Sequence, residues 1–391
     1  MASTFARRAC TAALAALAVA VSTSCGGGKD DGTAGATAAS APSASGPAVS
    51  RVIVAGDSLA DVGTFGFKAT VQSAANPAAG YPLYPEIVAR DLGLGSLCNY
   101  FSSRDYVVFT TNAGCTDFAV GGADAFNPTV RGGSELPFSL QHQLEHAVAA
   151  NGGGWQPGDL IIVDAGANDA VGLASTYRDA RGGGSSQAIF LALLLQQLSA
   201  STVNQALAQP DGGSVAAGLY MQQLARTYWT TVKANTLDKG ATRVALLDVP
   251  DITLTPKFRT IVGEIAAAEG AAAANAYQAA LRQWIAAFNT ELARLVAGEP
   301  RALLVPYAED FTAQAANPAA FGLTNVTTAA CPPAGDFPDC TDAALDASPP
   351  AGLAPGWWKT WAFSNPFHPS PRGHELLAAT VERALAKAGW R

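Results

Sequence analysis

The chain has 391 residues, which is enough for one large domain or two ordinary ones. Hydrophobic residues make up 49% of it and charged residues only 14%, which excludes a globally disordered chain and favours a large apolar core. Its 24 basic and 31 acidic residues give a net charge of -7, and no cluster of Lys and Arg occurs, so we expect no nucleic-acid partner.

The first 25 residues are expected to be a signal peptide. Arg7 and Arg8 precede the apolar run TAALAALAVAV at 11–21, which is too short to span a bilayer comfortably. Two processing routes compete. The AVA at 18–20 fits ordinary signal peptidase, whereas STSCGGG resembles a bacterial lipoprotein junction in which Cys25 is acylated, although Ser22 stands where that pattern usually has Leu.

We favour the lipoprotein interpretation, because the Gly/Ala/Ser-rich stretch at 26–50 would then be a flexible tether. Residues 51–391 would form the folded domain. The expected location is therefore outside the cytoplasm. Either a lipid on Cys25 attaches an outer-membrane or periplasmic lipoprotein to the membrane, or the protein is secreted.

Outside the expected signal peptide the chain has four cysteines. They predict two disulfides, because four cysteines in an exported chain usually pair. Three pairings are possible, and the sequence-local one is the simplest. Metal binding is the poorer interpretation, since the chain has no CxxC motif and no His pair near a cysteine. The four residues are Cys98, Cys115, Cys331 and Cys340.

Short apolar runs bounded by Gly, Pro or Asp predict buried strands, with helical patterns between them. This alternation indicates βαβ units, an α/β fold and a mostly parallel sheet that is covered on both faces. The strand candidates are RVIVAG (51–56), DLIIVDAG (159–166), TRVALLDVP (242–250), RALLVPY (301–307) and the weaker CTDFAVGG (115–122).

The clearest helical pattern covers 263–297. A last helix is expected in SPRGHELLAATVERALAKAG, with Ser370 as N-cap, Pro371 in the first turn and Gly389 at the end. The apolar AIFLALLL at 188–195 belongs either to the core or to a lid over a site.

Polar residues and glycines follow three of the predicted strands. Ser58 comes after the first, Gly121 and Gly122 after the weak one, and Asn168 and Asp169 after DLIIVDAG. Because ligands bind at the carboxyl ends of strands in open parallel sheets, we expect these residues to meet at one sheet edge.

Four segments resemble, in order, the four sequence blocks of the GDSL or SGNH hydrolases. They are GDSLADVG (56–63), DFAVGGADA (117–125), DAGANDA (164–170) and NPFHPSPRGH (365–374). One block alone is weak, but four in order form a specific signal, and the resemblance extends from about residue 51 to the C-terminus. It implies a flavodoxin-like three-layer α/β/α fold with a mostly parallel five-stranded sheet. It also implies a serine hydrolase that cleaves carboxylic esters without a metal or other cofactor.

The resemblance gives the candidate residues their roles. Ser58 is the expected nucleophile, although a serine in this position would by itself more often be a helix N-cap. The Ser58 N–H, the Gly122 N–H and the Asn168 side chain are the expected oxyanion donors. Taken alone, Gly122 and Asn168 are equally typical of turns. Asp169 is expected to hold its loop. Asp117, where the family often has Asn, is expected to play a structural part beside Cys115.

His368 matches the catalytic base of the family. His142 and His146 are spaced by one helical turn without the HExxH pattern, so we expect a solvated helix face there rather than a metal site. His374 falls in the first turn of the last helix and is expected to be structural.

Asn365 departs from the family, whose last block usually reads Asp-x-x-His. An amide oxygen can accept the His Nδ1–H and set the tautomer, but it cannot stabilise the imidazolium by charge. In one serine protease the Asp→Asn change cost about 10⁴ in kcat. We therefore expect Asn365 to affect the rate more than the type of reaction.

The leading hypothesis is an exported esterase or lipase that acts on a small-molecule or lipid ester through a Ser58–His368 acyl-enzyme. Two alternatives remain. A phospholipase or acyltransferase of the same family would use the same acyl-enzyme, and a catalytically weak binding lipoprotein would keep the fold but not the rate.

Overall fold

The computed structural model describes residues 48–77, 79–331 and 335–391. The expected signal peptide, Cys25 and nearly all of the expected tether lie outside these residues. Within the described ranges, no helix is both long enough and apolar enough to cross a membrane.

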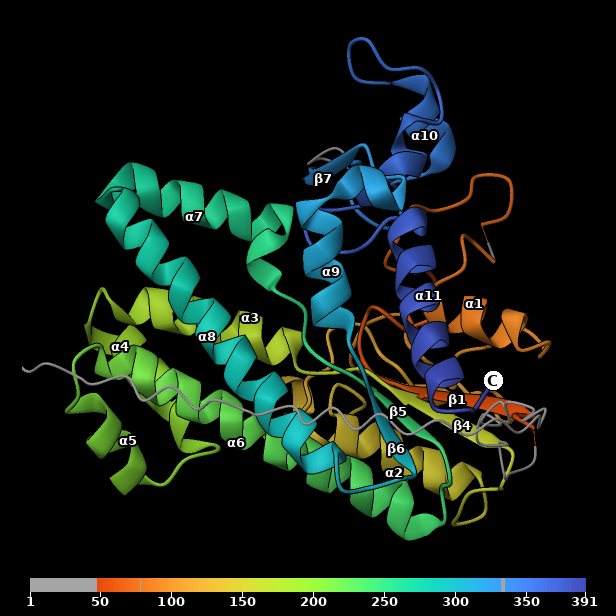
Figure 1. Ribbon diagram of the computed structural model, residues 1–391, viewed down its shortest axis with the longest axis horizontal. Helices are drawn as coiled ribbons and strands as arrows, with labels where there is room; N and C mark the ends of the chain where they lie inside the picture. The colour runs from red at the N-terminus through yellow and green to blue at the C-terminus, as the bar shows by residue number, and fades with distance from the viewer. Residues whose placement is uncertain (1–47, 78, 332–334) are drawn as a thin grey trace, which may run out of the picture. The chain divides into compact units, whose positions relative to one another are not determined.

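A four-stranded parallel sheet forms the centre of the fold (Figure 1). Its strands run in the order β1 (Arg51–Ala55), β4 (Asp159–Val163), β5 (Val244–Leu247) and β6 (Ala302–Val305). Ile53 pairs with Ile161, and Ile161 with Val244, which fixes the register across the first three strands. The predicted α/β fold with a mostly parallel sheet is confirmed.

The weak fifth strand predicted at 115–122 is wrong as an independent strand. The segment makes β-type hydrogen bonds to β1, from Val54 N–H to Thr116 O at 3.0 Å and from Phe118 N–H to Val54 O at 2.8 Å, but it forms only an isolated bridge there. The ladder stops there because Gly56 N–H, which would pair next with Phe118 O, donates instead to Gln143 Oε1 at 2.8 Å. The bonds of the segment lie on the edge of β1 away from β4, so the segment takes the fifth place in a flavodoxin-like 2-1-3-4-5 order.

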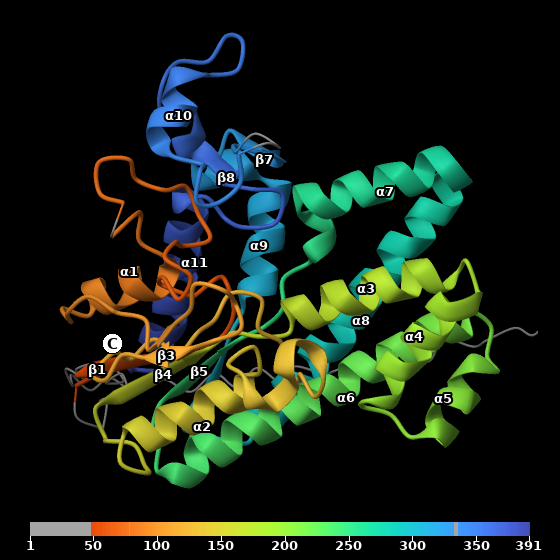
Figure 2. The ribbon, with the colours of Figure 1, turned by 180° about the vertical axis from the view of Figure 1, so that it is seen from behind.

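Helices cover both faces of the sheet (Figures 1 and 2). Successive strand residues point to opposite faces. Val54 and Ile162 therefore pack against α1 (Tyr84–Asp91), α9 (Tyr307–Ala316) and α11 (Pro371–Lys387). Ile53 and Ile161 face the other layer, which contains α2 (Leu140–Ala150), α3 (Ala167–Ala180), α6 (Gly212–Asn235) and α8 (Ala271–Val296).

The other elements are short or peripheral. They are the hairpin β2 (Phe101–Ser102) and β3 (Thr110–Thr111), the parallel pair β7 (Asn325–Ala329) and β8 (Trp361–Phe363), and the helices α4 (Gly184–Leu195), α5 (Ala200–Leu207), α7 (Pro256–Glu269) and α10 (Asp342–Ala347).

Two helix predictions have different outcomes. The single helical pattern at 263–297 is interrupted at Gly270, whose φ of +93° separates α7 from α8. The last helix begins as predicted: the Ser370 hydroxyl accepts a hydrogen bond from Gly373 N–H, and Pro371 is the first helical residue.

The disulfides follow the sequence-local pairing. Cys98 is bonded to Cys115, and Cys331 to Cys340. The first disulfide ties down the chain just before residues 116–120, and the second closes the segment before α10.

Candidate active site

Ser58 lies in the turn that follows β1. The Asp57 carboxylate accepts a hydrogen bond from Leu59 N–H at 2.9 Å, and the Asp57 N–H donates to Asp164 Oδ1 at 2.9 Å. No helix begins at this turn; the next one is α1 at Tyr84. Ser58 is therefore not a helix N-cap.

The Ser58 hydroxyl is paired with His368. Ser58 Oγ lies 2.8 Å from His368 Nε2, and His368 Nδ1 lies 2.9 Å from Asn365 Oδ1. The amide oxygen is an acceptor, so it selects the tautomer that carries the proton on Nδ1 and leaves Nε2 free to accept from Ser58. Asn365 Oδ1 also accepts the backbone N–H groups of Phe367 and His368, at 3.0 and 2.7 Å, which fixes its direction.

Burial lowers the pKa of His368 to about 4, while the carboxylate of Asp336 raises this pKa and the ammonium of Lys257 lowers it. The imidazole is therefore neutral near pH 7 and able to take up a proton.

Two backbone N–H groups beside Ser58 have no partner in the part of the chain that the structure describes, those of Ser58 itself and of Gly122. The neighbouring Gly121 N–H is occupied, because it donates to Asp61 Oδ2 at 2.7 Å. Gly122 has a φ of +81°, a conformation that residues with a Cβ rarely adopt. Of the two glycines, Gly122 is thus the one with a free donor.

Asn168 stands in the first turn of α3, next to this pair. Its Nδ2 donates to Ala123 O at 2.9 Å and lies 3.4 Å from Asp57 Oδ2, so one of its two N–H groups is only weakly engaged. Asp169 accepts from the N–H groups of Ala125 and Phe126, at 2.8 and 3.3 Å, and so holds the loop as expected.

These groups line one open cavity of about 440 Å³. It is lined by Ser58, Gly122, Asn168, Asn365 and His368. Most of the other wall is apolar and aromatic: Phe65, Phe67, Ala69, Tyr106, Val171, Phe337, Pro366 and Phe367. A cavity of this kind fits an apolar ligand that is oriented by a few polar groups.

The apolar AIFLALLL segment does not reach this cavity. It forms most of α4, which packs mainly against α3. Phe190 and Leu194 are buried, whereas Ile189 and Leu195 are exposed. The helix is therefore one side of the core rather than a lid.

The other histidines lie elsewhere. The rings of His142 and His146 on α2 contact one another at a tilt of 32°, with ring centroids 4.4 Å apart, and both pack against Phe101. The expected solvated helix face is thus partly an aromatic contact, and the described residues contain no group of three ligands able to hold a metal ion. His374 is fully buried in α11, in keeping with a structural role.

Asp117 is fully buried beside the site and accepts the N–H groups of Val62 and Ala119, at 3.1 and 2.8 Å. Burial raises its pKa well above the usual value. It connects the turn after Ser58 to the segment that carries Gly122.

The sequence did not point to Asp336, Lys257 or Phe337 as neighbours of the site. Asp336 and Phe337 lie between two cysteines that form a disulfide, outside every recognisable motif. The cysteine pair was the only signal, and it indicated a closed loop without indicating what that loop contacts.

A model of the family described as GDSL-like Lipase/Acylhydrolase matches residues 52–381. The matched range contains all five candidate residues of the site. No curated protein matches the chain.

Proposed function

The chain belongs to the GDSL-like Lipase/Acylhydrolase family, and from this membership we propose that it is an exported serine hydrolase that cleaves carboxylic esters. The family supports a hydrolase of the esterase and lipase type. The observation that carries the finer proposal is the 2.8 Å contact of Ser58 Oγ with His368 Nε2, beside two N–H groups that have no partner among the described residues.

In the proposed reaction, Ser58 Oγ attacks the ester carbonyl carbon while His368 Nε2 takes up the hydroxyl proton. The carbonyl oxygen becomes an oxyanion that accepts from the N–H groups of Ser58 and Gly122 and from Asn168 Nδ2. The imidazolium then protonates the departing alcohol, which leaves the acyl group on Ser58. His368 deprotonates a water molecule that attacks this acyl-enzyme. The bond from Ser58 Oγ to the acyl carbon then breaks, and the imidazolium returns its proton to Ser58 Oγ as the acid leaves.

The aromatic wall of the cavity supports an ester with an apolar acyl part. Phe65 and Phe67 come from the turn after Ser58, and Phe337 and Phe367 come from the other side of the cavity. Charged groups in the wall are few, which favours neutral lipid or small-molecule esters as substrates.

Export is part of the proposal. The two disulfides support folding in an oxidising compartment. Mass spectrometry of the mature N-terminus decides between a lipid on Cys25, cleavage after AVA, and an unprocessed chain; the last result would contradict export.

The catalytic proposal is tested by a fluorophosphonate probe and by p-nitrophenyl esters of increasing chain length. We expect labelling of the wild type, loss of both labelling and hydrolysis in Ser58→Ala, and no change in Ser185→Ala, an exposed serine on α4. An unlabelled wild type, or a Ser58→Ala variant that still hydrolyses esters, would rule out the proposal. Added alcohol distinguishes acyl transfer from hydrolysis by the appearance of a new ester.

A further inference from the structure

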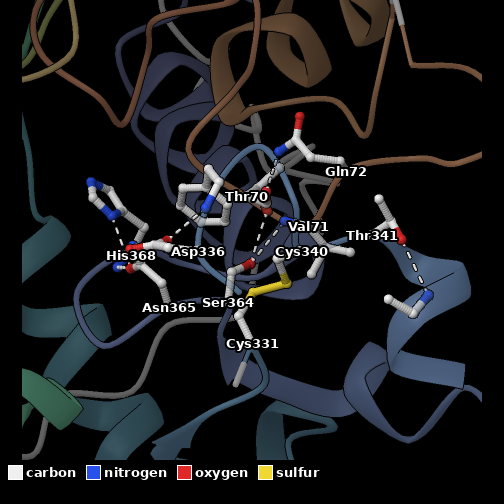
Figure 3. Close-up of a disulfide and its surroundings, with 12 residues drawn as sticks. Thr70, Val71, Gln72, Cys331, Asp336, Cys340, Thr341, Ser364, Asn365 and His368 are labelled. Carbon is white, nitrogen blue, oxygen red and sulfur yellow. Dashed lines mark hydrogen bonds between the residues drawn. A yellow bond between two sulfur atoms is a disulfide. The ribbon is translucent and has the colours of Figure 1, made fainter. Parts of the chain in front are cut away.

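The proposed base is oriented by an amide, but a carboxylate lies directly behind that amide. Asn365 Nδ2 donates to Asp336 Oδ1 at 2.9 Å, while Asn365 Oδ1 faces His368 Nδ1 (Figure 3). The contacts form one continuous chain from Ser58 through His368 and Asn365 to Asp336. A negative charge is therefore present, one residue farther from the base than in a Ser-His-Asp triad.

Asp336 fixes which way the Asn365 amide points. Three N–H groups surround Oδ1, and the carboxylate lies against Nδ2. A flipped amide would place its NH₂ among those three donors and its oxygen against Asp336, so every contact would become repulsive. The amide orientation in turn sets the tautomer of His368.

The charge of Asp336 also acts on the base. Asp336 raises the pKa of His368, against the larger effect of burial. The other charged or titratable groups near this imidazole act in the opposite direction or add no negative charge: Lys257 on α7 lowers its pKa, and His374 on α11 is buried and neutral. Of the groups that shift the pKa of His368, Asp336 is the carboxylate, and its charge favours the imidazolium.

The backbone holds Asp336 in place from both sides. The Cys331–Cys340 disulfide brackets it in sequence. Cys331 N–H donates to Ser364 O at 2.7 Å, next to Asn365, and Gln72 N–H donates to Cys340 O at 2.8 Å. The Asp336 carbonyl accepts from Cys340 N–H at 3.1 Å, and its carboxylate accepts from Phe337 N–H at 2.8 Å. The loop is thus anchored to the same segment that carries the base (Figure 3).

We propose that Asp336 is a positioning residue of the active site, which orients Asn365 and supplies through it the negative charge that stabilises the His368 imidazolium. The proposal rests on the proposed ester hydrolysis. Asn365 and Asp336 together take the place of the single aspartate that the family usually has.

The test is an exchange of the two groups. Asp336→Asn keeps an acceptor for Asn365 but removes the charge, so kcat is expected to fall by about tenfold to a hundredfold. Asn365→Asp alone places two carboxylates against each other, which repel. The double variant Asp336→Asn/Asn365→Asp restores an amide–carboxylate pair with the charge next to His368, and its kcat is expected to exceed that of either single variant and of the wild type.

The matched control is Asp339→Asn. Asp339 is exposed between the same two cysteines, and its side chain makes no hydrogen bond to a described residue. The Asp339→Asn substitution removes the same charge from the same loop. We expect it to leave kcat unchanged, both in the wild type and in the Asn365→Asp variant. The melting temperature of each variant shows whether folding is intact.

The titration of the His368 imidazole by NMR is the second readout. Asp336→Asn should lower the pKa of His368 and move the acid limb of kcat/KM, which is expected near pH 4 in the wild type, to lower pH. A purely structural residue would not move this value, and the titration needs no activity. An inactive wild type would end the hydrolase proposal, whereas an active one with unchanged kcat and pKa in Asp336→Asn, or with no recovery in the double variant, would overturn the role of Asp336 alone.

Discussion

The side chain of Gln143 on α2 makes two hydrogen bonds to the backbone of Gly56, the residue two places before Ser58. Gln143 Oε1 accepts from Gly56 N–H at 2.8 Å, and Nε2 donates to Gly56 O at 2.9 Å and to Pro137 O at 2.8 Å. Gln143 is fully buried. A helix of one layer thus fixes the end of β1 and, through it, the start of the turn that carries the candidate nucleophile.

Replacing Gln143 by Met keeps the volume but removes all three hydrogen bonds. Each buried group left without a partner costs about 1–3 kcal/mol, and a displaced Ser58 turn should lower kcat by about tenfold to a hundredfold. Urea unfolding and steady-state kinetics measure the two effects. Gln141→Met, on the exposed side of α2, should change neither; a normal kcat in Gln143→Met would show that the turn is held by other contacts.

Gly56 has no room for a side chain. A Cβ there would lie 1.8 Å from Asp164 Oδ1 and 2.7 Å from the Asp164 carbonyl oxygen. Asp164 cannot move away easily, because it accepts from Asp57 N–H and from the Tyr84 hydroxyl. Gly56→Ala is therefore expected to destabilise the fold by about 3 kcal/mol or more.

The control for this change is Gly172→Ala. Gly172 is exposed within α3, and a Cβ there meets nothing within 4 Å. Alanine is the better helix former, so the melting temperature should stay the same or rise. Equal stability of the two variants would contradict the crowding at Gly56.

Loss of one oxyanion donor should affect the rate rather than substrate binding. Asn168→Ala removes Nδ2 from the edge of the cavity, and kcat should fall by about 10²–10³ with little change in KM. Asn204→Ala, at an exposed position on α5, is the control. A rise in KM at constant kcat would assign Asn168 to ground-state binding instead.

His374 should make the fold sensitive to acid. Burial lowers its pKa to about 3, from 6.5 in the unfolded chain. Between these values the unfolded state binds a proton that the folded state does not, so stability falls as the pH falls through this window, by about 1.4 kcal/mol per pH unit.

His374→Leu removes this proton uptake. His368 has a depressed pKa of the same sign, about 4, but it is present in both proteins and cancels in the comparison. Urea unfolding at pH 7 and at pH 5 should therefore show the variant gaining on the wild type as the solution is acidified. A stability difference that stays constant with pH would mean that His374 is not neutral in the folded state.

Much of the fold followed from local patterns. The runs 51–56 and 159–166 are short and apolar on both faces, which is what a central parallel strand requires, and both are strands in the structure. The helical pattern of apolar residues continues across Gly270, so it predicted one helix. In the structure, the positive φ of Gly270 divides this segment into α7 and α8. The run 115–122 failed as a strand because the Gly56 N–H that would extend its ladder with β1 donates to the Gln143 side chain instead.

By itself, the sequence determined the four strands of the sheet and the last helix, and it placed Ser58, Gly122 and Asn168 after strands at one sheet edge, because these depend on hydrophobic period and on topology. The resemblance to the GDSL hydrolases added His368. Only the tertiary structure decided what supports them. Gln143 on α2 contacts Gly56 across 87 residues, and Asp336 contacts Asn365 across 29. Such hydrogen bonds depend on how segments far apart in the sequence are placed against one another. Packing sets that placement for Gln143, and the Cys331–Cys340 disulfide brackets Asp336.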